Sequence, residues 1–236
     1  MSFIHLRTHT EYSVVDGMLR IDAAAAAARA DGQGALAITD LNNLFGTIKF
    51  YSACRSQGVK PLIGVDVLME PNGGAPGGDR QASRLLLLVQ DNQGYLNVCE
   101  LLARGWVTNA QRAQAWIKWE WLAELGAGLI ALSGADLGAV GMALLSGEAE
   151  RARAMAKRLA GLFPGRFYIE LQRAGLPAHE PHVRAAVALA AQLQLPVVAA
   201  HPVEFLHADD FDAHEARVCI AEGETLHCVP CRSAYT

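Results

Sequence analysis

The sequence lacks the features of a membrane or secreted protein. No apolar run approaches the roughly 20 residues that span a bilayer, and the opening MSFIHLRTHTEYS does not have the basic-then-apolar order of a signal peptide. Cysteine is scarce, because the chain has only 5 among 236 residues, an odd number that suits a reducing compartment better than a disulfide framework. We therefore expect a soluble cytoplasmic protein with no membrane partner.

An excess of positive charge is also missing. The chain has 20 Lys and Arg residues against 24 Asp and Glu residues, which gives a formal net charge of −4. A protein that binds DNA by itself presents a basic surface to the phosphate backbone. We therefore expect this chain to contact DNA only as part of a larger assembly.

The sequence does contain a regular alternation of apolar runs and helix-forming segments. Seven short apolar runs predict strands at 3–6, 35–39, 61–69, 84–90, 129–133, 166–172 and 196–201. Between them, helical spacing of apolar residues predicts helices at 21–31, 44–57, 94–104, 137–145, 148–162 and 180–193. This order predicts an α/β fold with a parallel sheet and crossover helices. A doubly wound sheet and a barrel both fit, and seven similar units without a glycine-rich dinucleotide motif favour a seven-stranded β/α barrel.

We interpret residues 1–225 as one domain. Residues 70–79 combine Gly, Pro and Asn and predict an exposed loop between two strands. Residues 226–236 show no periodicity and are expected to begin a linker toward a further domain. Cys228 and Cys231 lie in this segment without a second Cys or His pair nearby, so we expect reduced thiols there rather than a zinc site.

Polar residues gather where the predicted strands end. Arg7 and His9 follow the first strand, and Asp40 and Asn42 follow the second, on either side of Leu41. Asp66 lies within the third strand, and His201 and Glu204 follow the seventh. The carboxyl ends of parallel strands converge on one face of a β/α fold, so these side chains are candidates for a shared cleft. Imidazole is a good ligand for zinc or manganese, but an arginine cannot coordinate a cation and would repel one. On the residues alone, polar groups that only line the barrel mouth are favoured over a metal site.

Seven ordered blocks then make the sequence recognisable. They are IHLRTHTEYSVVDG at 4–17, AITDLNNLFG at 37–46, GVKPLIG at 58–64, NQGYLN at 92–97, GLIALSG at 128–134, FYIELQ at 167–172 and DDFDAHE at 209–215. Together they resemble the polymerase and histidinol phosphatase (PHP) domain that opens the alpha subunits of bacterial replicative DNA polymerase III. The resemblance covers nearly the whole chain and implies a distorted seven-stranded (β/α) barrel of the PHP type.

Departures from the family pattern fall on the metal-ligand positions that the resemblance implies. Non-ligating or altered residues stand at most of them: Arg7 and Leu41 in place of histidines, Arg84 for the fourth-strand His, Ala135 for a Cys, Ala174 for a His, and Pro202 and Glu204 for an Asp-x-His pair. His9, Asp16 and Asp66 stand out as possible family ligands, with Asp40 beside them and His5 and His201 as unconventional extras.

The resemblance therefore implies a vestigial cleft without a catalytic residue or a metal cluster. A cluster of cations needs many anionic or imidazole ligands to offset its mutual repulsion, and most of them are missing here. We expect the guanidinium groups of Arg7 and Arg84 to pair instead with carboxylates such as Asp16, Asp40 or Asp66.

The family also implies a function for the longer protein. The parent would be a DNA-directed DNA polymerase, a nucleotidyltransferase that uses magnesium bound by palm aspartates. Because this stretch lacks the palm, we expect it to be inactive by itself and to need no cofactor. It would stabilise the rest of the polymerase chain and dock the proofreading exonuclease subunit of the replicase. The alternative is a free-standing metal-dependent PHP phosphoesterase with a rebuilt ligand set.

Three further histidines receive plainer interpretations. His179 and His182 lie three residues apart at the start of a predicted helix, where a solvated helix end is the favoured reading over a ligand pair. His214 and Glu215 fall in the last family block and are expected to cap or pack the final helix.

Overall fold

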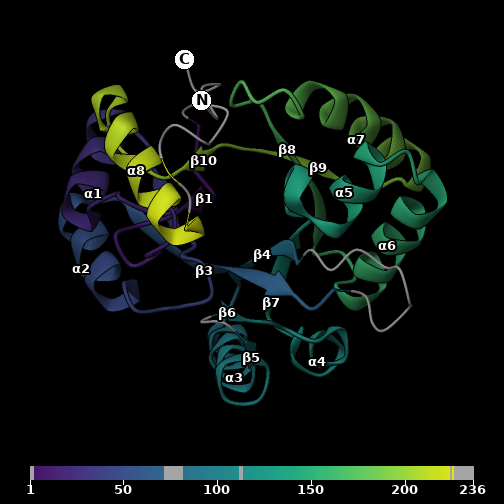
Figure 1. Cartoon of the computed structure of the whole chain (residues 1–236). Helices are drawn as coiled ribbons and strands as arrows, with labels where there is room; N and C mark the ends of the chain where they lie inside the picture. The colour runs from purple at the N-terminus through teal and green to yellow at the C-terminus, as the bar shows by residue number, and fades with distance from the viewer. Residues whose placement is uncertain (1–2, 72–81, 112–113, 224, 226–236) are drawn as a thin grey trace. The chain divides into compact units, whose positions relative to one another are not determined.

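The computed structural model describes residues 3–71, 82–111, 114–223 and 225, and Figure 1 shows their course. Contacts divide the chain into two compact units, which are described separately below. The first unit comprises residues 1–64, 174–176 and 200–236, and the second comprises residues 65–173 and 177–199. The expected linker at 226–236, with Cys228 and Cys231, and most of the expected loop at 70–79 lie outside the described residues.

The elements follow one another in a mixed α/β order. They are β1 (Arg7–Thr8), α1 (Ile21–Ala30), β2 (Ala35–Ile38), α2 (Thr47–Gln57), β3 (Lys60–Met69), β4 (Ser83–Val89), α3 (Asn92–Thr108), β5 (Ala110–Gln111), β6 (Gln114–Ala115), α4 (Trp119–Leu125), β7 (Leu129–Leu132), η1 (Ala135–Leu137), α5 (Ala139–Leu145), α6 (Ala149–Leu162), β8 (Phe167–Gln172), α7 (His179–Leu193), β9 (Val197–Ala200), β10 (Pro202–Val203), η2 (Ala208–Asp210) and α8 (Phe211–Glu222). No helix in the described part of the chain is both long enough and apolar enough to cross a bilayer.

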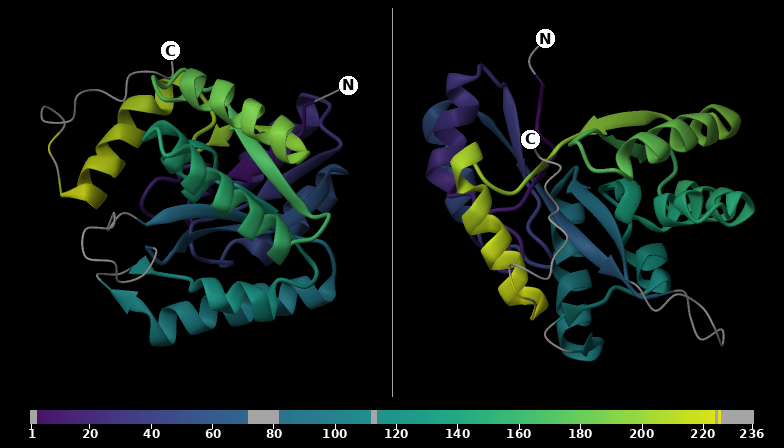
Figure 2. Two further views of the ribbon diagram at one scale, coloured as in Figure 1. Left: turned by 90° about the vertical axis from the view of Figure 1, so that its right-hand side faces the viewer. Right: turned by 45° about the horizontal axis from the view of Figure 1, so that its top comes forward.

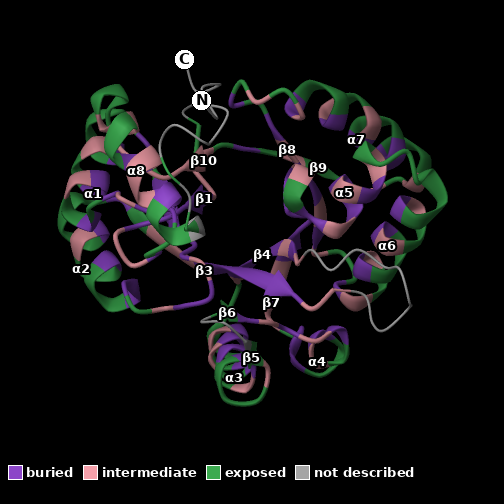
Figure 3. Ribbon diagram, in the orientation of Figure 1, coloured by how far each residue is buried: buried purple, intermediate pink, exposed green. Residues whose placement is uncertain are grey.

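The first unit joins the two ends of the chain. Strand β1 pairs in parallel with β10, with Arg7 opposite Pro202, and β2 pairs in parallel with the first half of β3. Helices α1 and α2 lie side by side and both pack against β2 (Figure 1). Their shared core includes Ile21 and Phe50, and the small alanines of α1 allow close helix packing. Figure 3 shows this buried inner side against an exposed outer side.

The second unit is built on the sheet order β3-β4-β7-β8-β9. Strand β7 runs parallel to β8, and β4 runs antiparallel to β7 with Leu86 opposite Leu132. Helix α3 packs with α4, while α5 packs with α6 and α7; Figure 2 shows both groups in two further views. Leu85, Leu86 and Leu87 of β4 are almost completely buried, so both faces of this strand are covered.

Two expectations about the strands were wrong. The first strand is Arg7–Thr8 rather than 3–6, because Phe3 and Ile4 are 45% and 38% exposed and lie outside the core. The sheet is also not parallel throughout, since β4 opposes β7. The leucine run of β4 indicates burial on both faces, which parallel and antiparallel central strands share, so it carries no information on strand direction.

Candidate functional site

Backbone hydrogen bonds bring the polar strand ends of the first unit together. The N–H of His9 donates to the carbonyl oxygen of Val203 at 2.8 Å, and the N–H of Thr39 donates to that of Thr8 at 3.0 Å. These bonds align the residues that follow β1, β2 and β10. His9, Asp40 and Glu204 are therefore placed by strand pairing, as expected for side chains at the carboxyl ends of parallel strands.

His9, Asp16 and Glu204 form a compact group. Nδ1 of His9 lies 2.9 Å from Oδ1 of Asp16, and both residues are buried. One ligand atom from each of the three residues lies within 4.8 Å of the others, and in the described part of the chain this is the one such group of His, Cys, Asp or Glu. A Cβ at Gly17 would collide with the carbonyl oxygen of Thr10, so the turn that returns Asp16 to His9 requires glycine.

Helix α8 contributes a fourth group to this place. Nε2 of His214 lies 2.9 Å from Oε2 of Glu204, and His214 is buried. Burial lowers the pKa of His214, but the hydrogen bond to Glu204 and the charges of Glu204 and Glu215 outweigh it, so the pKa is raised overall. Glu204 thus has a basic partner supplied by the protein itself. From the sequence, His214 was expected to cap or pack the final helix, and a His beside a Glu in a family block was the one available signal.

Asp40 is held by hydroxyl and amide donors. It accepts hydrogen bonds from the N–H of Thr10 at 2.6 Å, from Oγ1 of Thr10 at 2.8 Å and from Oγ of Ser13 at 2.9 Å. Burial raises the pKa of Asp40, and the Thr10 and Ser13 hydrogen bonds and the nearby His9 oppose that shift in part. Next to it, Leu41 donates its N–H to Oγ of Ser13 at 2.8 Å and has no ligand atom in its side chain. Asp40 therefore ties the strand ends together.

In the second unit, Arg84 and Asp66 form an ion pair. Nη1 of Arg84 lies 3.2 Å from Oδ2 of Asp66, whose side chain is completely buried. This is one of the guanidinium–carboxylate pairings expected from the sequence. Ala135, at the position of the family Cys, is fully buried with a φ of 50°, and it offers only a methyl group.

The remaining predicted residues of the first unit are distributed differently. Arg7 is buried within β1. His201 is exposed and its ring lies 6.0 Å from the ring of His5, so it does not join the group at His9. Ala174, which stands at the position of another family His, is buried and has no ligand atom.

The solvated-helix interpretation of His179 and His182 was wrong. Both residues are buried, 2% and 1% exposed, because α7 packs against β8, η1 and α5. Nε2 of His179 lies 3.7 Å from Oδ1 of Asp136. Burial lowers the pKa of His179 and of His182, and the charge of Asp136 opposes both shifts. These histidines belong to the packing of α7.

One Asp-x-Asp pair, Asp210 and Asp212, stands at the start of α8. Oδ2 of Asp210 accepts the N–H of His207 at 3.0 Å in a capping box. Asp210 therefore caps the short 3-10 helix η2 that leads into α8, a structural task.

Comparisons with known proteins identify the family. The family model described as the PHP domain matches residues 5–174. The chain belongs to the PHP domain family. It is 42% identical over 226 residues to the DNA polymerase III subunit alpha of Pseudomonas aeruginosa and 47% identical over 229 residues to that of Neisseria meningitidis serogroup A. These alignments cover 96% and 95% of this chain but only 19% and 20% of the relatives, so the chain spans about a fifth of their length.

Solved structures with low sequence identity share the fold. A protein of Bifidobacterium adolescentis, provisionally named a metal-dependent phosphoesterase, superposes with a TM-score of 0.54 at 12% identity and covers 91% of this chain and 96% of its own. An amidohydrolase of Chromobacterium violaceum superposes with a TM-score of 0.51 at 17% identity and the same coverage. Together with the family match, these structures confirm the expected α/β class and the distorted (β/α) barrel of the PHP type.

Proposed function

We propose that the chain is the PHP domain of a DNA polymerase III alpha subunit and serves DNA replication as a structural and docking module. The observation that carries this proposal is similarity over 95% of the chain to proteins named subunit alpha, at 40% identity for that of Escherichia coli K12. The exonuclease subunit of the replicase is the proposed docking partner, and nucleotidyl transfer with magnesium is assigned to the longer polymerase chain.

The partners of three carboxylates, those of Asp66, Glu204 and Asp40, support a structural role. Asp66 takes its counter-charge from Arg84, Glu204 faces His214, and Asp40 accepts three hydrogen bonds from Thr10 and Ser13. In a metal-dependent hydrolase such carboxylates are anionic ligands, and the cations neutralise them. Here Arg84, His214 and the hydrogen-bond donors of Thr10 and Ser13 lie beside these carboxylates in place of such cations.

The residues present do not fit a cluster of several cations. Leu41, Ala135 and Ala174 have no ligand atoms, and a guanidinium group cannot coordinate a metal. The group formed by His9, Asp16 and Glu204 fits one cation at most. We therefore derive no metal-dependent step for this chain.

A primer-extension assay tests the proposal. The longer chain encoded by the same reading frame should extend a primer with template, nucleotides and magnesium, whereas the 236-residue chain should not. A reading frame without any polymerase continuation, or incorporation by the short chain free of host polymerase, would contradict it.

A second candidate is a single-metal phosphoesterase, and the geometry of His9, Asp16 and Glu204 is the observation that favours it. Elemental analysis of protein purified without chelator or affinity tag distinguishes the two. Under the main proposal, the metal content is below one ion per chain and His9→Ala leaves it unchanged. Stoichiometric zinc, manganese or iron, lost together with phosphoesterase activity in His9→Ala, would favour the second candidate.

A further inference from the structure

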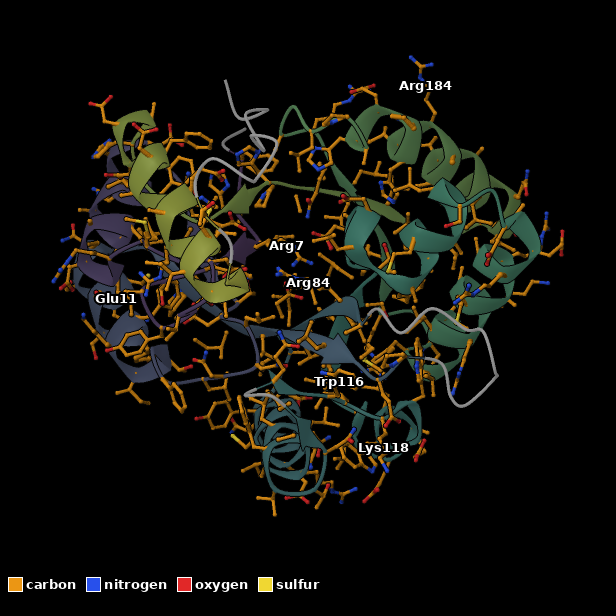
Figure 4. All side chains as sticks on the ribbon, viewed as in Figure 1. Arg7, Glu11, Arg84, Trp116, Lys118 and Arg184 are labelled. Atoms are coloured by element: carbon orange, nitrogen blue, oxygen red, sulfur yellow. The ribbon has the colours of Figure 1, made fainter. Side chains whose placement is uncertain are left out.

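Two histidines that are far apart in the sequence lie beside each other in the first unit. The rings of His5 and His201 have centres 6.0 Å apart, and their planes meet at 65°. Strand pairing places them, because Arg7 of β1, labelled in Figure 4, lies opposite Pro202 of β10, close in sequence to both histidines. The carbonyl oxygen of His5 also accepts the N–H of Ala37 at 3.0 Å. The backbone of the pair is therefore fixed before any ligand binds.

His5 carries a ring nitrogen without a partner. His5 is half-buried, and within the described residues its Nδ1 is shielded from solvent and makes no hydrogen bond. Burial lowers the pKa of His5, the neighbouring His201 lowers it further, and the charge of Asp31 opposes these effects in part. His5 is consequently neutral at neutral pH, and one of its ring nitrogens offers a lone pair to a metal ion.

The spacing of the two rings fits the ligands of a single ion. Two imidazole ligands with Zn–N distances of about 2.0–2.1 Å bring their ring centres to about 5–6 Å from each other. The observed 6.0 Å between the rings of His5 and His201 is close to that separation. Asp31, whose Oδ2 accepts Nε2 of Gln33 at 2.9 Å, adds a fixed negative charge that acts on His5. Imidazole pairs of this kind suit zinc and its neighbours in the periodic table rather than magnesium.

We propose that His5 and His201 bind one zinc ion, with water completing its coordination, and that the ion links β1 to the residue before β10. The pair shares no residue with the group formed by His9, Asp16 and Glu204, so this is a separate site. Its role is structural, and it does not depend on the proposed function. Because only two protein side chains hold the ion, it is released during purification, and zinc must be added to observe it.

Calorimetric titration of the chelator-treated, dialysed 236-residue chain with zinc chloride tests the proposal. We expect saturable binding that His5→Gln and His201→Gln each weaken at least about tenfold, because each variant removes one of the two protein ligands. Magnesium chloride should give no saturable binding, because Mg²⁺ prefers oxygen ligands. Zinc should also raise the melting temperature of the unchanged chain and leave that of His5→Gln unchanged, because only the folded chain brings the two rings together.

The matched control is His207→Gln, which removes an exposed histidine of the same unit. It should bind zinc within about twofold of the unchanged chain. Two further variants distinguish other ligands: His9→Ala removes the buried histidine of the separate group, and Cys228→Ser/Cys231→Ser removes two thiols near the end of the chain. Thermal unfolding without zinc verifies that each variant is folded.

Four results would overturn the proposal. They are no zinc binding by the unchanged chain, binding that both His5→Gln and His201→Gln retain, binding lost only in His9→Ala, and binding lost only in Cys228→Ser/Cys231→Ser. The third result would assign the ion to the group at His9, and the fourth would assign it to the thiols. None of them bears on the proposed function, which primer extension tests separately.

Discussion

Asp66 of β3 and Arg84 of β4 form an ion pair in the core of the second unit. Asp66 is completely buried, while the side chain of Arg84 is 20% exposed. A buried carboxylate that loses its cation keeps its desolvation cost without compensation. The main effect of the pair is therefore to compensate the cost of burying the Asp66 carboxylate, and its net contribution to the free energy of unfolding is small.

Replacing Arg84 alone should consequently destabilise the protein. We expect Arg84→Met to lower the free energy of unfolding by about 2–4 kcal/mol, and Asp66→Asn in the same chain to restore part of that loss. Urea denaturation of the two single variants and the double variant measures the coupling. Arg104→Met is the control, because Arg104 pairs with exposed carboxylates of Glu100 and Glu124 and should change stability less. Equal denaturation midpoints for Arg84→Met and Arg104→Met would refute this account.

Some features of the candidate site could be predicted from the type of a single residue, and others could not. For Leu41, Arg7 and Arg84, residue type alone shows that these side chains offer no ligand atom for a cation, because a leucine or an arginine cannot coordinate one. The role of His214 was not readable. It depends on α8 placing Nε2 beside Glu204, a contact between residues that only the folded chain brings together. His179 and His182 were expected to be solvated but are buried. Their position at the start of a helix does not by itself indicate whether they are buried.

At the scale of elements, α7 shows how buried histidines couple packing to pH. His179 and His182 both face the region of η1 and β8, where Asp136 and Glu170 are the acidic neighbours, and Glu180 lies beside His179 on α7 itself. Burial lowers the pKa of both histidines below the usual 6.5. The unfolded chain therefore binds more protons than the folded chain between the lowered values and 6.5.

Stability should accordingly fall as the pH falls through this window. The contribution of the two neutral histidines is complete above the unfolded pKa and is lost as pH decreases toward the folded values. We expect His179→Gln/His182→Gln to reduce the loss of melting temperature between about pH 7 and about pH 5. His214, whose pKa is raised, acts in the opposite sense and is unchanged in this variant. His207→Gln, at an exposed histidine, should keep the pH slope of the unchanged chain, and the same slope in all three proteins would disprove the assignment.

The elements themselves were largely predictable where the sequence pattern is local. Helix α1 was expected at 21–31 and spans Ile21–Ala30, since its alanines have high helix propensity. Helix α4, at Trp119–Leu125, was not among the predicted helices, although α5, which also has seven residues, was. The direction of β4 was missed because strand direction is set by connections rather than by composition.

For the whole molecule, the charge balance limits what the chain does with DNA. At a net charge of −4 it releases few counterions from a polyanion. We expect a dissociation constant weaker than about 10 µM for single-stranded and duplex DNA near physiological salt. Fluorescence anisotropy with labelled oligonucleotides measures it, and submicromolar binding by the 236-residue chain would contradict the prediction.

The parallel pairing of β1 with β10 also has a consequence for folding during synthesis, because the two strands are far apart in the sequence. Arg7 has Pro202 as its partner, and the guanidinium of Arg217 reaches the carbonyl oxygen of Val14. A ribosome adds about 5–20 residues per second, so the nascent chain waits on the order of ten seconds or more before the second strand of this pair exists. During that interval β1 exposes an unpaired edge to other chains and to chaperones. Strand β1 thus completes its pairing with β10 only after the residues between the two strands have been made.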